Sequence, residues 1–500
     1  MKFNLSTILS ESARISPEAS YLVTDAATHT YAEIDAWADR AAGVLASRGI
    51  GIGTRVALRL PNIPAFFPYY FALLRRGAVI VPMNPLLSDR EVATIVHDAT
   101  VSHLIVLGED EVDTPAGIQR WNLEELMATE TQVGPLVDIA QTDGDDTALI
   151  IFTSGTTGRP KGAELTHLQL FLTVLLEGDT YGITSDDVLL GALPLFHIYG
   201  LSGVLHSATS RAQTIYLMNG FSTQTVYDAI ESHGVSVILG VPTMYHALIA
   251  ADDGTRDLSS VRIAVSGGAP MPMEMVRDLE RTFPNVTYLE GYGLTETCSA
   301  GTVNGGPFPY REGSIGRPLW GMQMRVVDLD GHELPPGPDH TGELVLRGHG
   351  IMKGYLDRPD QTSEALREGW LYSGDIAWID RDGYAYLVGR LKELIIRGGY
   401  NVYPREIEEV LYAHPGVSAA AVVGRPDAHH GEEIVAFVVP TDANVDVHDV
   451  IEFVRQNLAH YKCPREVIMI DSLPQGSTGK IDKSVLRATV IAKDTVGDNA

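Results

Sequence analysis

An alternation of helical and strand-like segments constrains the fold of this chain more than any other feature. Residues 31–49 place apolar side chains at helical spacing and end at a glycine, and residues 55–60 then follow as a short strand. The same pair recurs as a helix over 65–76 and a buried strand over 78–81, closed by Pro82. Further strands are expected at 104–107, 148–152, 188–193, 237–239 and 263–265. Because strands that alternate with helices form helix-covered parallel sheets, we expect a largely parallel, layered α/β body.

The pattern changes in the second part of the chain. Past Gly313, short strands broken by turns at 330–331 and 382–383 predict a small antiparallel β region. Beyond Arg390 the order is strand, helix (404–414), strands (418–423 and 434–439), helix (447–458) and strand (467–470), a compact α+β unit. We therefore expect a large domain over 1–391 and a small mobile C-terminal domain over 392–500, with a loosely ordered tail from about Ile491.

Composition limits the classes of molecule that this protein is expected to bind. A chain of 500 residues is too long for one compact core, which favours two domains and a deep substrate pocket. Lys and Arg number 37 against 64 Asp and Glu, so the net charge of −27 disfavours nucleic acid and a stable membrane anchor. The two cysteines are too few for a disulfide framework, and neither a signal peptide nor a membrane-spanning run is apparent. These features predict a cytoplasmic protein.

A loop rich in glycine and hydroxyl residues follows the strand at 148–152. Its residues are Thr153, Ser154, Gly155, Thr156, Thr157, Gly158, Arg159, Pro160, Lys161 and Gly162, and Thr166 is placed to cap a helix after it. Glycines allow backbone N–H groups to face an anion, hydroxyls add donors, and the lysine supplies a positive charge. The spacing is not that of a Walker loop. We interpret the segment as a phosphate-binding loop rather than an ordinary surface loop.

Several motifs together resemble the adenylate-forming enzymes, a family that includes acyl-CoA synthetases, luciferases and peptide-synthetase adenylation domains. They are the loop at 153–162, Pro194-Leu195-Phe196-His197, Gly291-Tyr292-Gly293-Leu294-Thr295-Glu296-Thr297, Tyr372-Ser373-Gly374-Asp375, Gly389-Arg390-Leu391-Lys392-Glu393 and Thr478-Gly479-Lys480. The stretch Ile396-Arg397-Gly398-Gly399-Tyr400-Asn401-Val402-Tyr403-Pro404 is most similar to that of medium- and long-chain fatty acid–CoA ligases. The resemblance covers most of the chain and implies ATP, coenzyme A and a small carboxylic acid as substrates.

The resemblance also implies roles at the nucleotide. Glu296, with Thr153, would hold Mg²⁺, and Asp375 and Arg390 would contact the ribose. The rest of the ATP and AMP site would comprise the loop from Thr153 to Lys161 together with Gly268, Ala269, Pro270, Gly291, Tyr292, Gly293 and Thr295. Taken singly, a glutamate, aspartate or arginine at such positions is as easily a solvated or turn residue.

The acyl end and the reacting groups follow from the same resemblance. The acyl pocket would be lined by His197, Tyr199, Gly200, Gly267, Gly291 and Cys298. His197 is expected to position the substrate, although a lone histidine in an apolar setting is more often a core residue. Lys480 would be the lysine that bridges the substrate carboxylate and the α-phosphate, and so neutralises charge during attack.

The position of Lys480 implies domain movement. Because it lies in the small domain, that domain must close for the first half-reaction and turn for the second. The resemblance places the hinge at Lys392 and assigns Gly399, Tyr400 and Asn401 to the coenzyme A channel. The chain departs from many relatives at Pro474-Gln475-Gly476-Ser477, where a glycine adds backbone freedom.

The identity of the acid is only narrowed by the sequence. Amino acids are disfavoured because no aspartate follows Phe196, and dicarboxylates because Gly291 stands where malonate-activating relatives place an arginine. A medium- or long-chain fatty acid is the first expectation and an aromatic acid such as a cinnamate is the alternative. A luciferase-like oxygenase and a non-catalytic nucleotide-binding relative are further alternatives, and a homodimer is one of the oligomeric states left open.

Overall fold

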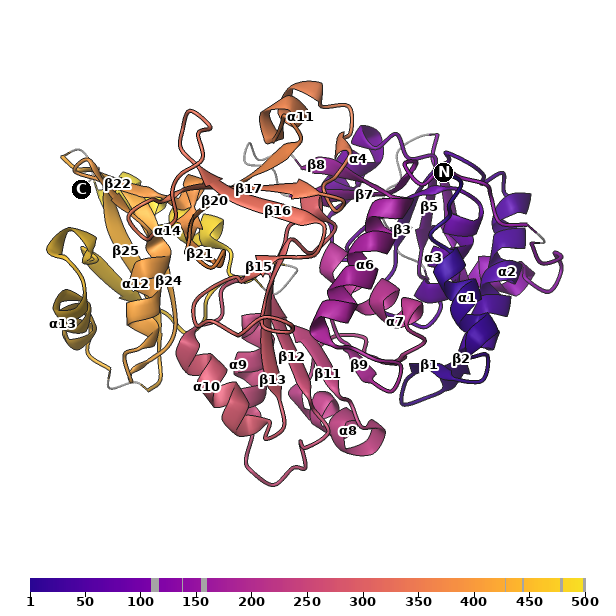
Figure 1. Ribbon diagram of the computed structural model, residues 1–500, viewed down its shortest axis with the longest axis horizontal. Helices are drawn as coiled ribbons and strands as arrows, with labels where there is room; N and C mark the ends of the chain where they lie inside the picture. Colours follow the sequence, from indigo (N-terminus) through magenta and orange to yellow (C-terminus); the bar gives the residue numbers. More distant parts are fainter. Residues whose placement is uncertain are drawn as a thin grey trace.

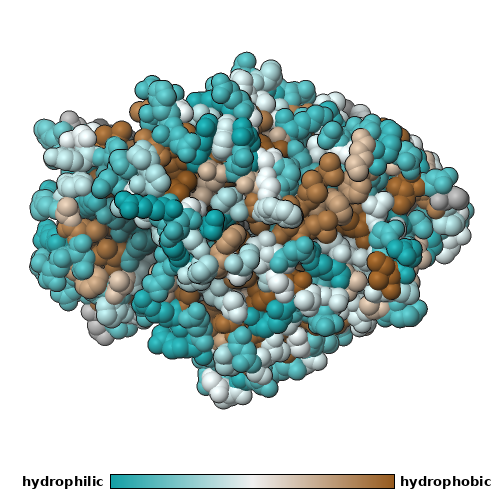
Figure 2. Space-filling model, in the orientation of Figure 1, coloured by the Kyte–Doolittle hydropathy of each residue, from teal (hydrophilic) through white to brown (hydrophobic). Residues whose placement is uncertain are grey.

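The computed structural model describes residues 1–108, 117–136, 138–153, 160–427, 429–442, 445–476 and 480–497. It confirms a mixed α/β fold with a large N-terminal domain and a small C-terminal domain, which lies at the left of Figure 1. The visible face in Figure 2 is mostly hydrophilic, and apolar residues gather over the region of the large domain that contains α6.

One sheet of the large domain runs in the order β18-β8-β7-β4-β3-β5-β6. The strands β4, β3, β5 and β6 are parallel to one another and to β7, whereas β8 is antiparallel to both β7 and β18. Their bounds are β3 Arg55–Arg59, β4 Val79–Pro82, β5 His103–Val106, β6 Gln119–Asn122, β7 Thr147–Thr153, β8 Lys161–Thr166 and β18 Gly354–Tyr355.

A second sheet runs in the order β15-β14-β13-β12-β11-β9-β10-β1-β2. Its centre from β13 to β1 is parallel, and β2, β14 and β15 are antiparallel additions at the edges. The bounds are β1 Ser20–Val23, β2 Thr28–Thr30, β9 Val188–Gly191, β10 Thr214–Leu217, β11 Val237–Gly240, β12 Ile263–Gly267, β13 Thr287–Tyr292, β14 Thr302–Asn304 and β15 Arg317–Pro318.

Helices connect and cover these strands (Figure 1). Their starts and ends follow local chemistry: Thr30 and Glu33 form a capping box at the start of α2, and the helix ends just before Gly49, whose φ is +80°. Every residue of α3 is buried, as expected of a helix enclosed by other elements. The bounds are α1 Thr7–Ile15, α2 Tyr31–Ser47, α3 Phe66–Arg75, α4 Asp89–Asp98, α5 Leu123–Thr129, α6 His167–Tyr181, η1 Tyr199–His206, α7 Ser207–Ser210, α8 Thr223–His233, α9 Pro242–Ala251 and α10 Met273–Thr282.

The expected antiparallel β region is present between the large sheets and the small domain (Figure 1). It pairs β16 Met322–Val327, β17 Gly342–Gly348, β20 Trp370–Ile379, β19 Leu366–Arg367 and β21 Ala385–Arg390, with η2 Thr295–Thr297 before it and α11 Pro359–Ala365 beside it. The short helix η3 Leu391–Glu393 leads from β21 to the next sheet. The exact domain boundary at 391/392 stays a prediction.

The small domain has the expected order of strands and helices. It comprises β22 Ile395–Arg397, β23 Tyr400–Val402, α12 Pro404–Tyr412, β24 Val417–Asp427, β25 Gly431–Pro440, α13 Val447–Asn457, η4 His460–Lys462, β26 Glu466–Met469 and α14 Lys483–Gly497. Separate apolar cores lie on the two faces of β24 and β25. Each face is therefore covered by its own helices, α12 and α13 on one and α14 on the other.

One element was not expected and one expectation was wrong. The strand β8, which begins at Lys161 and pairs antiparallel with β7, was not expected, whereas Thr166 caps α6 as expected. The tail is not irregular from Ile491, because α14 continues to Gly497. Leu486 and Val490, in the part of α14 before Ile491, lie at i, i+4 spacing and are buried against the sheet.

Candidate active site

The segment predicted to bind phosphate connects β7 and β8. Thr153 ends β7 and pairs with Lys161, the first residue of β8, and Ser154, Gly155, Thr156, Thr157 and Gly158 fall outside the described residues. The Lys161 Nζ lies 5.0 Å from the centre of the Tyr355 ring, and the Tyr355 hydroxyl donates to Glu296 Oε1 at 2.7 Å. The fold therefore brings Lys161 and Glu296 to the same tyrosine, Tyr355. This tyrosine was not identified from the sequence.

The predicted ribose contacts are held together by β20 and β21. Asp375 and Arg390 are partners in the strand register, and Arg390 Nε lies 3.1 Å from Asp375 Oδ1. The Tyr292 hydroxyl donates to Asp375 Oδ2 at 2.6 Å. The aspartate is 4% exposed, and its negative charge raises the pKa of Arg390. The Asp375 carboxylate is therefore held by one partner on each oxygen, Arg390 on Oδ1 and Tyr292 on Oδ2.

The expected adenine segment follows β12. Gly267 ends the strand, and Gly268 has φ +80°, a conformation that favours glycine. A Cβ atom at position 268 would lie 2.8 Å from Lys480 Cε and 3.3 Å from Lys480 Nζ, so the glycine also makes room for that side chain. Exposed Pro270 and half-buried Ala269 continue the turn. This segment lies at the carboxyl end of a parallel strand, where α/β sheets bind ligands.

Lys480 lies in the C-terminal part of the small domain and reaches Gly268 of the large domain. The Gly476 N–H donates to the Lys480 carbonyl at 2.8 Å, and Gln475 and Ile481 form an isolated bridge beside it. Burial and the positive charge of Arg390 lower the pKa of Lys480, while Asp375 opposes that shift. Lys480 therefore lies close to the ribose pair and to Gly268 at once, with the small domain closed over the site.

His197 lies close to Lys480 in a neutral form. Burial, with the lysine charge as a second cause, lowers the pKa of His197 to about 3. The backbone N–H of Tyr199 donates to His197 Nδ1 at 3.2 Å. Because Nδ1 accepts, the proton of the neutral ring belongs on Nε2, which can donate to a substrate oxygen. The imidazole is therefore arranged as a hydrogen-bond donor.

Three of the expected acyl pocket residues, Tyr199, Gly267 and Gly291, meet at the ends of β12 and β13. Gly267 and Gly291 are register partners, and a Cβ at 267 would lie 3.2 Å from the Tyr199 ring. A Cβ at 200 would lie 2.1 Å from the Pro194 carbonyl oxygen, so η1 can start there only with glycine. Cys298 is fully buried, and burial raises the pKa of its thiol. It is a packing residue and not a nucleophile.

The remaining motif residues support the turn after β13. A Cβ at Gly293 would lie 1.8 Å from the Ser299 carbonyl oxygen, and Thr295 is buried at the start of η2. The glycine therefore lets the chain fold back on itself, which places Glu296 beside Tyr355.

The residues expected at the hinge and the coenzyme A channel lie apart from this group. Lys392 is exposed in η3. Gly399, Tyr400 and Asn401 are exposed at the turn of the β22–β23 hairpin, and β22 lies at the far left of Figure 1, away from β12. The Tyr400 ring stacks on Tyr461 with centroids 4.7 Å apart. The structure therefore places Lys480 at the site and the predicted coenzyme A residues outside it.

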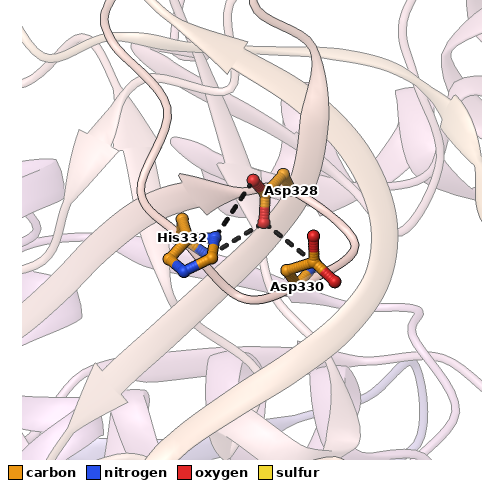
Figure 3. A group of neighbouring side chains, drawn as sticks. All are labelled: Asp328, Asp330 and His332. Carbon is orange, nitrogen blue, oxygen red and sulfur yellow. Dashed lines mark hydrogen bonds and ion pairs between the residues drawn. The ribbon is translucent and has the colours of Figure 1, made fainter.

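A cluster with possible metal ligands lies elsewhere, in the turn between β16 and β17. Asp328, Asp330 and His332 face one another there (Figure 3). Asp328 Oδ1 accepts from the backbone N–H groups of Asp330 and His332, both at 2.9 Å. These bonds are those of an Asx turn, which explains the arrangement without a metal.

Sequence reasoning missed two buried polar residues of α6. A Cβ at Gly291 would lie 2.6 Å from the Tyr181 hydroxyl, and burial together with the charge of Glu177, one helical turn earlier, raises the pKa of Tyr181. The only signal in the sequence was a glutamate on the apolar face of an otherwise hydrophobic helix.

Comparison with known proteins matches two family models. The AMP-binding enzyme family matches residues 9–356, and the AMP-binding enzyme C-terminal domain matches residues 406–480. A feruloyl-CoA synthase from Amycolatopsis sp is 39% identical over 95% of this chain and 96% of its own. A long-chain-fatty-acid–CoA ligase from Mycobacterium tuberculosis is 35% identical over 97% of this chain and 98% of its own.

Solved structures agree over the whole chain. The ATP-bound MatB from Rhodopseudomonas palustris is 31% identical, with a TM-score of 0.89 over 97% of this chain and 99% of its own. An anthranilate CoA ligase in complex with anthranoyl-AMP is 25% identical, with a TM-score of 0.92 over 99% of this chain and 98% of its own. In the described part of the chain, the helices are too short or too polar to cross a membrane. The chain belongs to the AMP-binding enzyme family, among its AMP-forming acid–CoA ligases.

Proposed function

We propose that this protein joins a carboxylic acid to coenzyme A through an acyl-adenylate, with the residues of the site in the roles given below. In the first half-reaction the carboxylate attacks the α-phosphorus of ATP and pyrophosphate leaves. In the second, the thiol of coenzyme A attacks the acyl carbon, AMP leaves and the thiol proton is released. The approach of Lys480 to Gly268, Asp375 and Arg390 is the observation that supports these roles most directly.

Lys480 is proposed as the group that aligns the first attack. Its ammonium lies within reach of the nucleotide end and of His197, whose pKa its charge lowers. A cation at that point can hold the carboxylate against the α-phosphate and neutralise charge that develops during attack. Burial lowers the pKa of this lysine, and the anionic substrates would favour its charged form.

His197 is proposed to orient the substrate carboxylate from the other side. Its Nδ1 is occupied by the Tyr199 N–H, so its Nε2–H can donate to a carboxylate oxygen. The low pKa makes it a poor base near neutral pH, which matches the absence of a proton to remove from an ionised acid.

Glu296 and Thr153 are proposed to hold Mg²⁺ with the ATP phosphates. A carboxylate and a hydroxyl are the hard oxygen ligands that this ion prefers, and the Tyr355 hydroxyl occupies only one oxygen of Glu296. The donor set therefore fits the ion. When bound, Mg²⁺ would neutralise charge on the leaving pyrophosphate.

The second half-reaction is proposed to use another orientation of the small domain. Lys392 is exposed in the short connector η3, where a change in backbone angles disturbs no core. A rotation there would withdraw Lys480 and carry Gly399, Tyr400 and Asn401 toward the site. An exposed aromatic ring on this hairpin is suited to contact coenzyme A.

The acid is proposed to be aromatic, in preference to the fatty acid that the sequence first suggested. The feruloyl-CoA synthase shares more identity with this chain than the long-chain-fatty-acid–CoA ligase does, 39% against 35%. This margin is small, so fatty acids remain the second candidate class and lipid metabolism the alternative setting.

Thioester formation tests the proposal. The enzyme is incubated with ATP, Mg²⁺, coenzyme A and a panel of cinnamates and saturated fatty acids, and acyl-CoA, AMP and pyrophosphate are quantified. We expect equal amounts of all three products with at least one cinnamate. AMP and pyrophosphate without a thioester would refute the coenzyme A step, and a preference for fatty acids would refute the aromatic assignment.

A further inference from the structure

A lysine at the start of α14 has no role in the chemistry described above. Lys483 is the first residue of this helix and lies three residues after Lys480. Its Nζ lies 3.0 Å from Glu393 Oε2 and 2.8 Å from Glu408 Oε1. Burial alone would lower the pKa of Lys483, but the two carboxylates outweigh it and raise the pKa, so the ammonium stays charged. This side chain therefore joins α14 to both η3 and α12.

The connector between the two domains is held at both ends. On the side of the large domain, Arg390 pairs with Asp375 at 3.1 Å, and the two residues are partners in the register of β20 and β21. On the side of the small domain, Glu393 is held by Lys483. Between these two anchors lie residues 391 and 392, and both are exposed. A change in backbone angles at these two residues would therefore leave both ion pairs in place.

The chain around Lys480 is tied to the same domain as Lys483. The Asp482 N–H donates to the Pro474 carbonyl at 2.8 Å, which joins the start of α14 to the chain ahead of Lys480. The helix α14 packs on β24 and β25 through a shared apolar core. A rotation at the connector therefore reaches Lys480 without slack as long as Glu393 stays fixed to the small domain.

An ion pair that only stabilises the small domain is the alternative interpretation. The domain contains a pair of that kind for comparison, because Lys462 Nζ lies 2.5 Å from Glu406 Oε1 and neither residue belongs to η3. Loss of either lysine removes a charge pair of the small domain, but only the loss of Lys483 releases Glu393. An effect on catalysis that is confined to Lys483 would therefore distinguish a positioning role from a general contribution to stability.

We propose that Lys483 is a positioning residue that clamps Glu393 to the small domain. The clamp confines the hinge to residues 391 and 392, and it thereby determines where Lys480 lies over the nucleotide. The proposal rests on the function proposed above and adds a device for its domain movement. A displacement of about 1 Å in a reacting group can cost about 100-fold in rate, so a loosened clamp should impair adenylation. The predicted ATP contact Asp375 lies in the large domain, so the KM for ATP should not change.

The two half-reactions of paired variants test the clamp. Lys483→Met removes the ammonium, and Glu393→Met releases the connector while Lys483 keeps its pair with Glu408. We expect each variant to lower kcat for pyrophosphate exchange into ATP by about 10- to 100-fold, with the KM for ATP changed by less than about 2-fold. Thioester formation from prepared acyl-AMP should fall less. Lys483→Arg should restore most of the rate, and the double variant should be no slower than Lys483→Met alone, because both changes release the same contact.

Lys462→Met is the matched control and should change pyrophosphate exchange by no more than a few-fold. Deuterium uptake of the peptide spanning residues 391–394 gives a readout that does not depend on activity, and it should rise in Lys483→Met and Glu393→Met but not in the control. Unchanged uptake, a rise across the whole small domain, or an unchanged kcat in both variants would overturn the proposal. An equal loss of kcat in Lys462→Met would overturn it too. Absence of exchange or of thioester in the wild-type enzyme would refute the proposed function, and the uptake would still decide the clamp.

Discussion

The polar groups at the predicted nucleotide end and at the predicted acyl end of the site differ in how completely they are hydrogen-bonded. At the nucleotide end, Asp375 is held by Arg390 and Tyr292, and the Glu296 carboxylate accepts from Tyr355. At the acyl end, Glu177 is buried with one oxygen unpaired within the described residues. Among the described residues, the Asp375 and Glu296 carboxylates are therefore paired within the fold, whereas one oxygen of Glu177 is not.

We relate this difference to two properties of the enzyme, its catalytic activity and its selectivity among acids. Groups that must bind the same nucleotide in every turnover gain from being fixed in advance, because a preorganised site pays no reorganisation cost during reaction. Groups that distinguish one acid from another gain from being unsatisfied by the wrong one. The following predictions test whether the two ends can be altered independently.

The largest effect is expected from Lys480→Ala. Loss of a cation aimed at the developing charge should lower the rate of adenylation by about 1000-fold. Chemically prepared acyl-AMP should still be converted to the thioester at a rate close to that of the wild type, because we assign this lysine to the first step alone. Pyrophosphate exchange and single-turnover thioester formation measure the two steps.

Lys462→Ala provides the control for that variant. Lys462 lies in the same domain but pairs with Glu406 at 2.5 Å, so its loss should change adenylation by no more than a few-fold. An equal loss of both half-reactions in Lys480→Ala would contradict the assignment of the lysine to the first step alone.

The next effect is a pH dependence of stability caused by Glu177. Its pKa is raised from 4.5 to about 7, so the folded protein binds a proton that the unfolded chain releases. The stability from this group is complete below pH 4.5 and is lost as the pH rises to about 7. The loss amounts to at most about 3 kcal/mol.

Glu177→Gln removes this titration. Relative to the wild type, the variant should therefore gain stability between pH 4.5 and pH 7.5, by about 1–3 kcal/mol. Urea unfolding at the two pH values measures the difference. A difference that is the same at both pH values would show that the carboxyl does not titrate in this range.

Asp375→Asn probes the nucleotide end. The amide keeps the shape of the side chain but removes the charge that Arg390 and Tyr292 surround. We expect the KM for ATP to rise by about 10- to 100-fold, the cost of a charge-assisted hydrogen bond, while the choice of acid is retained. Asp382→Asn, at an exposed turn, should leave the KM unchanged. A changed acid preference in Asp375→Asn would show that the two ends are coupled.

The fold was largely predictable because its elements are defined locally. The periodicity of residues 31–49 and 65–76 and the glycines that follow them specify α2 and α3 to within two residues. The strand β8 was missed because its residues, Lys161–Thr166, have no alternating apolar pattern and are held by pairing with β7. Pairing with a neighbouring strand cannot be read from the residues of one segment alone.

The sequence identified those candidate site residues that lie in short motifs and missed those that do not. Lys480, Asp375 and Arg390 each lie in a short motif, and the fold brings them together as expected. Tyr181 and Tyr355 lie in no motif, and their importance arises only from neighbours far along the chain, Gly291 and Glu296. Groups that form contacts across the fold need the structure to be recognised.

The smallest effect is expected from Tyr292→Phe. The substitution removes one hydrogen bond, from the tyrosine hydroxyl to Asp375 Oδ2, and leaves the Arg390 contact in place. The KM for ATP should rise by about 2- to 10-fold, with kcat and the preference among acids unchanged, because the carboxylate keeps its charge and one of its two supports. Steady-state kinetics with varied ATP measure this change. A shift in acid preference without a change in the KM for ATP would place Tyr292 at the acyl end, and the separation of the two ends would then fail at the strand they share, β13.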